Sequence, residues 1–255
     1  MAPLACSVLV TGSNRGIGLE LVQQLAETTD PPEHIFATCR NPAGSQGKAL
    51  RELADKHPTI HVVQLDVKDP SSLKAAVSVV ESHLNGKGLN LLINNAGVAI
   101  YGSLETMEQE EMLSVFNTNV VGPTLVVKEF LPLLKKAARE SATEGMSCGK
   151  AAIINLTSRL GSIGRGFEFE GPPVYSYRVT KAALNMATAC MASELQSEGV
   201  LCTALHPGWV KTDMGTAEAP LTVECSVRGI LRVLANLSSL ETGAFLDWEG
   251  NHFPW

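Results

Sequence analysis

The most constraining feature of the sequence is a regular alternation of short apolar segments with longer segments of helical period. Strands that alternate with helices need right-handed crossover connections, and these produce a mostly parallel sheet. Several of the apolar segments lack an alternating polar face, which is typical of strands that helices cover on both sides. We therefore predict an α/β fold: a doubly wound parallel sheet flanked by helices on both faces, formed by a single domain over residues 1–255.

The periodicity also places the individual elements. Strands are expected at Ser7–Val10, His34–Thr38, Ile60–Leu65, Asn90–Ile93, Ala151–Leu156, Val200–Leu205 and Ala244–Leu246. Helices are expected at Gly18–Glu27, Lys48–Lys56, Ser71–Leu84, Glu108–Lys136, Thr180–Gln196 and Thr222–Leu237.

Composition excludes several classes of protein. The formal net charge of −6 gives no electrostatic reason to expect a nucleic acid or an anionic membrane surface as a partner. The six cysteines form no C-x-x-C pair, which argues against a disulfide framework and against a bound metal. The N-terminus lacks the basic start of a signal peptide, and no apolar run approaches the roughly 20 residues of a membrane span. We therefore expect a cytoplasmic protein.

A glycine-rich turn follows the first expected strand and leads directly into a helix. It consists of Gly12, Ser13, Asn14, Arg15, Gly16, Ile17 and Gly18. Glycine lets a pyrophosphate approach bare backbone at a helix N-terminus, where N–H donors and the helix dipole favour an anion. A plain tight turn between strand and helix is the alternative. The place of the turn in the first strand–turn–helix unit favours dinucleotide binding.

The end of the second strand bears on the choice of dinucleotide. In NAD-selective folds an acidic side chain near this point binds the ribose hydroxyls, but here Arg40 follows Cys39. A guanidinium suits the 2′-phosphate of NADPH, and Arg15 in the glycine turn could supply a second one. Either arginine alone could be a solvated surface residue. Together they favour NADP(H) as the cofactor.

Tyr177 and Lys181 are the candidate acid–base pair. They are four residues apart at the start of an expected helix, so their side chains share one face. A free tyrosine has a pKa of about 10, and a nearby ammonium is expected to lower it toward the range useful to a general acid. Tyr175 lies six residues from Lys181, on another face, and is assigned to packing or to the substrate rim.

The order of these motifs resembles that of the short-chain dehydrogenases/reductases over nearly the whole chain. The matching residues are Gly12, Gly16, Gly18, Asn94, Asn95, Ala96, Gly97, Asn119, Ser158, Tyr177, Lys181, Pro207 and Gly208. Within that family the segments His206–Met214 and Asn251–Trp255 are most similar to the sniffer-type carbonyl reductases. The resemblance implies a Rossmann-like fold.

It also implies a role for each catalytic position. Tyr177 would protonate a carbonyl oxygen while hydride arrives from the nicotinamide. Lys181 would lower the pKa of Tyr177 and bind the nicotinamide ribose. Ser158 would hydrogen-bond the substrate carbonyl, and Asn119, rather than its neighbour Asn117, would complete a proton relay through a bound water.

Further positions resemble the cofactor contacts of the family. Asp66 and Val67 match the adenine-binding pair, and Asn94 through Gly97 would stabilise the sheet and line the adenosine side of the cleft. Pro207, Gly208, Val210 and Thr212 match the segment that holds the carboxamide and pyrophosphate, with Tyr177 and Lys181 completing the set. A plain core contact is the alternative for Val210.

Two irregular stretches, 161–176 and 213–220, follow expected strands and are candidates for the substrate rim, with plain surface loops as the alternative. Eighteen residues separate Ser158 from Tyr177, more than is usual in the family. Phe167, Phe169 and Tyr175 in this surplus could shape an apolar pocket, or could equally cap the core.

These observations predict an NADPH-dependent carbonyl reductase acting on ketones, aldehydes or quinones. A pteridine reductase or acyl-chain ketone reductase of the same family is an alternative, and a non-catalytic NADP-binding redox sensor is another. Family members often pair the helices that correspond to Glu108–Lys136 and Thr180–Gln196. A homodimer is therefore preferred, although both helices must also cover the sheet.

Overall fold

The computed structural model describes residues 4–166 and 173–255, which form one parallel sheet with the strand order β3-β2-β1-β4-β5-β6-β7. The strands are β1 (Ser7–Thr11), β2 (His34–Cys39), β3 (Ile60–Gln64), β4 (Leu91–Asn94), β5 (Ala152–Leu156), β6 (Leu201–His206) and β7 (Phe245–Asp247). All seven predicted strands are confirmed, each to within one residue at either end.

The strand order reverses its direction at β1. The chain runs outward from β1 through β2 to β3 and then returns to place β4 on the other side of β1, so that Val8 pairs with both Ile35 and Leu91. The connections after β1 and β4 therefore leave the carboxyl edge of the sheet in opposite directions. Such a switch point opens a crevice in which ligands of open α/β sheets bind.

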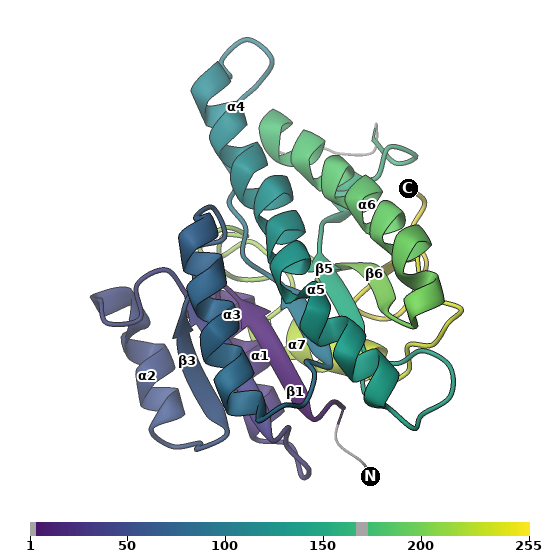
Figure 1. The fold of residues 1–255 in the computed structure, drawn as a ribbon. Helices are drawn as coiled ribbons and strands as arrows, with labels where there is room; N and C mark the ends of the chain where they lie inside the picture. Colours follow the sequence, from purple (N-terminus) through teal and green to yellow (C-terminus); the bar gives the residue numbers. More distant parts are fainter. Residues whose placement is uncertain (1–3, 167–172) are drawn as a thin grey trace.

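Helices cover both faces of the sheet (Figure 1). One face carries α1 (Gly16–Ala26), α2 (Lys48–Ala54) and α7 (Val223–Leu234), and the other carries α3 (Pro70–Leu84), α5 (Gly122–Glu140) and α6 (Tyr175–Leu195). Buried apolar side chains fill each interface, for example Leu21 and Ile230 on the first face and Phe130 on the second. The predicted doubly wound fold is confirmed.

The predicted helix Glu108–Lys136 is wrong in detail. It is divided into α4 (Gln109–Phe116) and α5 by a π-helical turn, η2 (Asn117–Val121), and α5 runs on to Glu140. A π turn adds one residue to the helical repeat without changing the sequence pattern visibly, so periodicity does not reveal it. The insertion turns the side chain of Asn119 inward, where it is completely buried.

The predicted start of the helix at Thr180 is also wrong, because α6 begins at Tyr175. The backbone N–H of Tyr175 donates to the carbonyl of Gly102 at 3.0 Å, and Gly102 forms a bridge with Val174. This contact holds the first turn of α6 in place from outside the helix. Tyr177 consequently lies in the first turn of α6.

The remaining short helices are η1 (Ser45–Gly47), η3 (Arg159–Gly161) and η4 (Gln196–Glu198). Within the described part of the chain, none of the helices combines the length and the apolar character that crossing a membrane requires.

Candidate active site

The glycine-rich turn lies at the carboxyl end of β1, and its shape requires glycine. Gly12 and Gly16 have φ values of +68° and +53°, which side-chain-bearing residues rarely adopt. A Cβ on Gly18 would lie 2.3 Å from the carbonyl oxygen of Gly12 and 2.4 Å from Nδ2 of Asn95. The backbone of the turn is therefore packed directly against the first turn of α1.

The segment after β4 braces this turn through hydrogen bonds. The Asn95 side chain donates to the carbonyl oxygens of Thr11 at 2.8 Å and Gly12 at 3.1 Å, while the Thr11 hydroxyl accepts from the backbone N–H groups of Asn95 and Ala96. Asn94 donates to Asn155 of β5 at 2.9 Å. Of the predicted segment Asn94 through Gly97, Asn94, Asn95 and Ala96 are thus tied by hydrogen bonds to β1, the glycine turn and β5.

The N-terminus of α1 fits a pyrophosphate. Its N-cap, Arg15, makes no side-chain capping bond, and the first turn contains no acidic residue. The initial N–H groups and the positive end of the helix dipole thus meet no capping side chain or carboxylate. Thr212 lies across from this end, since a Cβ on Gly16 would lie 3.4 Å from Cγ2 of Thr212.

Arg15 and Arg40, the two predicted phosphate-binding cations, are both exposed. The guanidinium of Arg15 pairs with the carboxylate of Asp213. Because an exposed ion pair contributes little free energy, this pairing leaves Arg15 available to a phosphate at small cost. Arg40 follows the end of β2, next to the buried Thr38, whose hydroxyl has no hydrogen-bond partner among the described residues.

Asp66 and Val67 follow β3 along the same edge of the sheet. The Asp66 carboxylate accepts from the backbone N–H of Lys68 at 3.0 Å, and its own N–H donates to the hydroxyl of Ser72 at 2.9 Å. Val67 is buried against Gly122, where a Cβ would lie 2.9 Å from Cγ2 of Val67. Both residues therefore lie at the carboxyl end of β3, with Val67 packed against the start of α5.

Tyr177, Lys181 and Ser158 come together where α6 passes the end of β5. The Lys181 ammonium donates to the carbonyl oxygen of Leu156 at 2.8 Å and lies 5.5 Å from the centroid of the Tyr177 ring. Ser158 is buried and caps η3, accepting from the N–H of Leu160 at 3.2 Å. A side-chain hydrogen bond also links Ser158 to Tyr177.

The prediction that Lys181 lowers the pKa of Tyr177 is wrong for this structure. Burial raises the pKa of Tyr177 to about 12, opposed only by the hydrogen bond from Ser158. Burial also lowers the pKa of Lys181 to about 8. The physical reason is that the ammonium is directed at the backbone of β5 and the face of the ring rather than at the phenol oxygen.

Asn119 projects from the π turn into the same region, but its amide is fully engaged. Oδ1 accepts from the N–H of Val98 at 2.9 Å, and Nδ2 donates to the carbonyl of Val98 at 2.8 Å and to the hydroxyl of Thr180 at 3.1 Å. Thr180 in turn donates to the carbonyl of Tyr177 at 2.8 Å. Asn117 is exposed. The side chain of Asn119 therefore ties the loop after β4 to α6.

The segment after β6 lies at the same carboxyl edge of the sheet. Gly208 has a φ of +87°, and a Cβ there would lie 2.3 Å from Leu221, so glycine is required. The carbonyl of Pro207 accepts from Ser226 at 2.6 Å. Val210 is only 4% exposed and forms a bridge with Leu221, which matches the core-contact alternative. The hydroxyl of Thr212 accepts from the N–H of Gly215 at 3.1 Å.

The predicted substrate rim is only partly covered by the described residues. Phe167 and Phe169, proposed to shape an apolar pocket, lie outside them. Tyr175 is described and partly exposed, as are Trp209 and Met214 near the second predicted rim segment. Sequence reasoning missed Thr180, which connects Asn119 to Tyr177. A buried threonine in an amphipathic helix gives no signal of its own.

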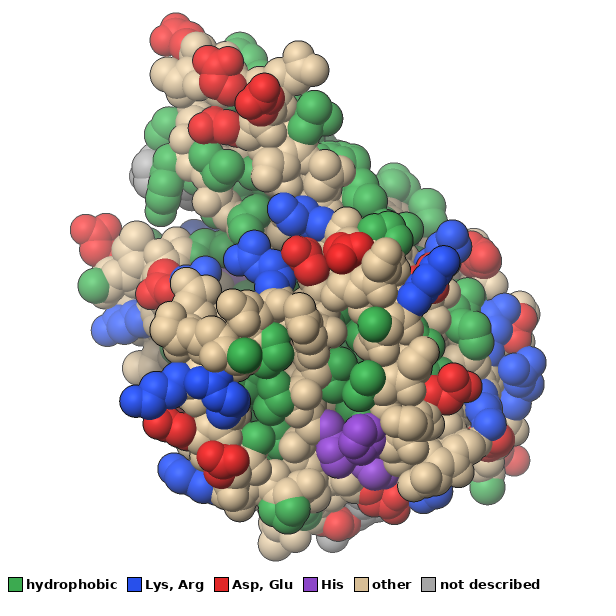
Figure 2. Space-filling model, turned by 60° about the vertical axis from the view of Figure 1, so that its left-hand side comes forward, with side chains coloured by type: hydrophobic (Ala, Val, Ile, Leu, Met, Phe, Trp, Pro, Cys, Tyr) green, Lys and Arg blue, Asp and Glu red, His purple; other side chains and the backbone are tan. Residues whose placement is uncertain are grey.

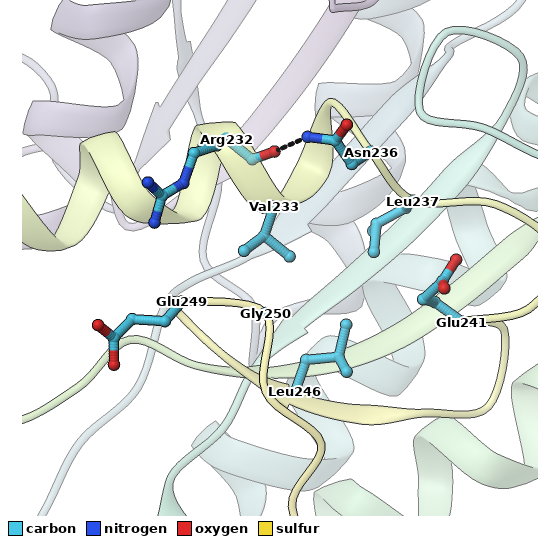
Figure 3. A pocket seen from close by; sticks show the side chains of 8 residues that line it. All are labelled: Arg232, Val233, Asn236, Leu237, Glu241, Leu246, Glu249 and Gly250. Carbon is cyan, nitrogen blue, oxygen red and sulfur yellow. Dashed lines mark hydrogen bonds between the residues drawn. The ribbon is translucent and has the colours of Figure 1, made fainter.

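A separate hollow of about 240 Å³ lies between the end of α7 and the turns that flank β7 (Figure 3). Its lining residues are Arg232, Val233, Asn236, Leu237, Glu241, Leu246, Glu249 and Gly250. None of the predicted site residues lines it. Among residues 4–166 and 173–255, no three or more His, Cys, Asp or Glu side chains are grouped so that they could hold a metal ion.

A dinucleotide-type glycine turn and a Ser–Tyr–Lys cluster, at the same carboxyl edge of a doubly wound sheet, define an oxidoreductase. The family model described as short chain dehydrogenase matches residues 7–220, and the chain belongs to the short-chain dehydrogenase/reductase family.

Two solved structures and one curated protein illustrate its relatives. The NADPH-bound carbonyl reductase from chicken fatty liver is 50% identical, with a TM-score of 0.94 over 98% of this chain and 99% of the other. Carbonyl reductase Sniffer of Drosophila melanogaster is 40% identical, with a TM-score of 0.93 over 98% and 100% of the two chains. The C-signal protein of Myxococcus xanthus is 38% identical over 168 residues, 66% of this chain and 93% of that one.

Proposed function

We propose that this protein is an NADPH-dependent carbonyl reductase that acts on ketones, aldehydes or quinones, with Tyr177 as the general acid. The observation that carries the proposal is the convergence of Ser158, Tyr177 and Lys181 at the carboxyl edge of the sheet, the edge that also carries the glycine turn. The similarity to an NADPH-bound carbonyl reductase supports the choice of cofactor and reaction. The exposed cations Arg15 and Arg40 support NADPH over NADH.

Bound NADPH would supply a hydride to the carbonyl carbon. Gly12 through Gly18 would hold its pyrophosphate at the start of α1, and Arg15 and Arg40 would face the 2′-phosphate. Thr212, which lies across from Gly16, would close over the pyrophosphate from the other side of the cleft.

The remaining chemistry belongs to the side chains of the cluster. Ser158 would donate a hydrogen bond to the carbonyl oxygen and orient it, and Tyr177 would transfer its phenolic proton to the same oxygen. The raised pKa of Tyr177 keeps that proton in place near neutral pH. Lys181 would bind the nicotinamide ribose and replenish the proton. Since the amide of Asn119 is occupied, that residue would support the relay by fixing the π turn.

The deciding experiment follows NADPH oxidation by absorbance with a panel of ketones, aromatic aldehydes, quinones, pterins and acyl-chain ketones. Tyr177→Phe should lower kcat for the best substrate about 10²-fold or more, because the general acid is lost. Tyr175→Phe is the matched control two residues away, and it should lose far less. Undiminished turnover in Tyr177→Phe would refute the assignment. Preference for a pterin or an acyl-chain ketone would favour the other family reactions.

We also propose a cytoplasmic homodimer. All six cysteines are free, which fits a reducing compartment. Exposed apolar side chains on α4 and α6, including Leu113 and Met186, could pack against a second copy. Light scattering after size exclusion measures the oligomeric state directly, and fractionation of cells tests the compartment.

A further inference from the structure

The last residues of the chain fold back along the edge of the sheet. After β7 the chain reverses at Gly250, and the Asp247 carboxylate fixes the turn by accepting from the N–H groups of Glu249 and Asn251, both at 2.9 Å. The returning segment then pairs antiparallel with β7, and the N–H of Phe253 donates to the carbonyl of Phe245 at 2.8 Å. We call residues 252–255 the C-terminal strap.

The strap binds the loop that follows Ser158. The hydroxyl of Ser162 donates to the carbonyl oxygen of Pro254 at 2.6 Å, and the N–H of Gly164 donates to that of Trp255 at 2.8 Å. The guanidinium of Arg165 lies 5.3 Å from the centroid of the Phe253 ring. Three successive strap residues thus contact three residues of one short loop.

The aromatic side chains of the strap pack against residues of β6 and β7. The Trp255 ring stacks on Phe245 of β7 with centroids 5.6 Å apart, and the Phe253 ring meets Phe245 at 5.5 Å and His206 of β6 at 6.0 Å. Phe245 is 1% exposed and anchors both rings in the core. The strap is therefore fixed to the ends of two strands independently of the loop that it binds.

Ser162 connects the strap to the candidate active site. It is the C-cap of η3, the single turn whose N-cap is Ser158, and its hydroxyl also accepts from the N–H of Arg165 at 3.2 Å. On the other side, Gly161 packs so closely on α6 that a Cβ would lie 2.6 Å from the backbone of Lys181. The η3 turn is held between the helix that carries Tyr177 and Lys181 and the C-terminal strap.

We propose that the C-terminal strap positions Ser158, with Ser162 as the positioning residue through which it acts. Resting on the proposed carbonyl reductase function, this predicts that loosening the strap impairs capture and orientation of the carbonyl substrate. Binding of NADPH should be unaffected, because the glycine turn follows β1, which β4, β5 and β6 separate from β7 in the sheet.

The test compares Ser162→Ala with Ser7→Ala. Each removes a buried serine hydroxyl that donates to a backbone carbonyl. Ser7, however, is the first residue of β1 and lies at the amino ends of the strands, away from the candidate active site at their carboxyl ends. Loss of one such bond corresponds to about a 3- to 10-fold effect. In Ser162→Ala we expect kcat/KM for a quinone such as menadione to fall by this factor, mainly because KM rises. The NADPH dissociation constant, measured by fluorescence titration, should be unchanged. Ser7→Ala should leave kcat/KM unchanged.

Hydrogen exchange of the peptide covering Ser158–Arg165 provides a readout that does not depend on turnover. It should become faster in Ser162→Ala and in Phe253→Ala, but not in Ser7→Ala. Unchanged exchange in this peptide, or equal loss of kcat/KM in both serine variants, would overturn the role of the strap. A wild-type protein that reduces no carbonyl compound would refute the proposed function, while the exchange measurement would still decide whether the strap holds Ser158.

Discussion

At the scale of single residues, the buried ammonium of Lys181 is the most consequential group in the site. Removing it from water lowers its pKa to about 8, whereas the same burial raises the pKa of Tyr177 to about 12. The lysine therefore loses its charge well before the tyrosine loses its proton. The alkaline limit of activity should then be set by Lys181.

We predict that kcat/KM for carbonyl reduction falls as the pH rises through about 8, where the ammonium is lost. Lys181→Met should be less active at every pH and should lack this decline, because it has no ammonium to lose. Lys150 precedes the amino end of β5, whereas the cluster lies at its carboxyl end. Lys150→Met therefore serves as the control and should keep the wild-type profile. A wild-type profile that stays flat to pH 10 would contradict this interpretation.

Asn119 and Asn117 provide a matched pair within one π turn. Asn119→Ala leaves the N–H and carbonyl of the partly buried Val98 without their partners, which should cost about 2–4 kcal/mol of unfolding free energy. Asn117→Ala, at an exposed position, should change stability by no more than about 0.5 kcal/mol. Urea denaturation of both variants measures the difference. Equal stabilities would show that the amide does not hold the turn.

The sequence allowed the members of the Ser158, Tyr177 and Lys181 cluster to be predicted, but not the directions of their side chains. The spacing of Tyr177 and Lys181 places both on one face of a helix. It does not reveal that the ammonium bonds the carbonyl of Leu156, because that carbonyl lies 25 residues away in the chain. The pairing of Arg15 with Asp213, 198 residues apart, is hidden for the same reason.

At the scale of elements, strands were easier to predict than helix ends. A strand buried on both faces shows as a continuous apolar run, so its limits are sharp. The start of α6 depends instead on the contact between Gly102 and Tyr175, and the π turn depends on the burial of Asn119. Both features are decided by tertiary contacts, which local periodicity does not contain.

The junction of β1 and α1 makes a prediction at this scale. Gly18→Ala would place a Cβ 2.3 Å from the carbonyl oxygen of Gly12, and the glycine turn would have to move. NADPH affinity should fall at least about tenfold, or about 1.4 kcal/mol, in a fluorescence titration. Gly149→Ala should have no such effect, since its nearest neighbour would be an ordinary contact at 3.4 Å. Retained affinity in Gly18→Ala would mean that the turn does not bind the nucleotide.

At the scale of the whole molecule, a histidine patch on the face seen in Figure 2 should make the stability of the fold depend on pH. His34 of β2, His61 of β3 and His83 of α3 lie together, with ring centroids 5.2 Å apart for the first pair and 4.4 Å for the second. Burial lowers the pKa of His61 to about 4, and repulsion from His83 and His34 adds to the effect. Burial also lowers the pKa of His34, against the pull of Glu33.

A histidine whose pKa is lower in the folded state binds fewer protons than it does in the unfolded chain. Its contribution to stability is complete above about pH 6.5 and is lost as the pH falls toward 4. We therefore expect a lower Tm at pH 5.0 than at pH 7.5, and a smaller difference in His61→Phe, which keeps the ring contacts without the titration. His57→Phe, outside the patch, is the control. A difference identical to that of the wild type would exclude His61 as a source.

The strand order also has a consequence for biosynthesis. The ribosome releases β1 through β4 first, and these segments alone would leave one edge of β4 without the partner that Ile93 later finds in Ile154. Open strand edges invite pairing with other chains. The proposed nicotinamide-side residues Tyr177 and Thr212 emerge after β5, so only part of the proposed nucleotide site can form while that edge is open. We therefore expect folding of this chain during translation to depend on the prompt arrival of β5.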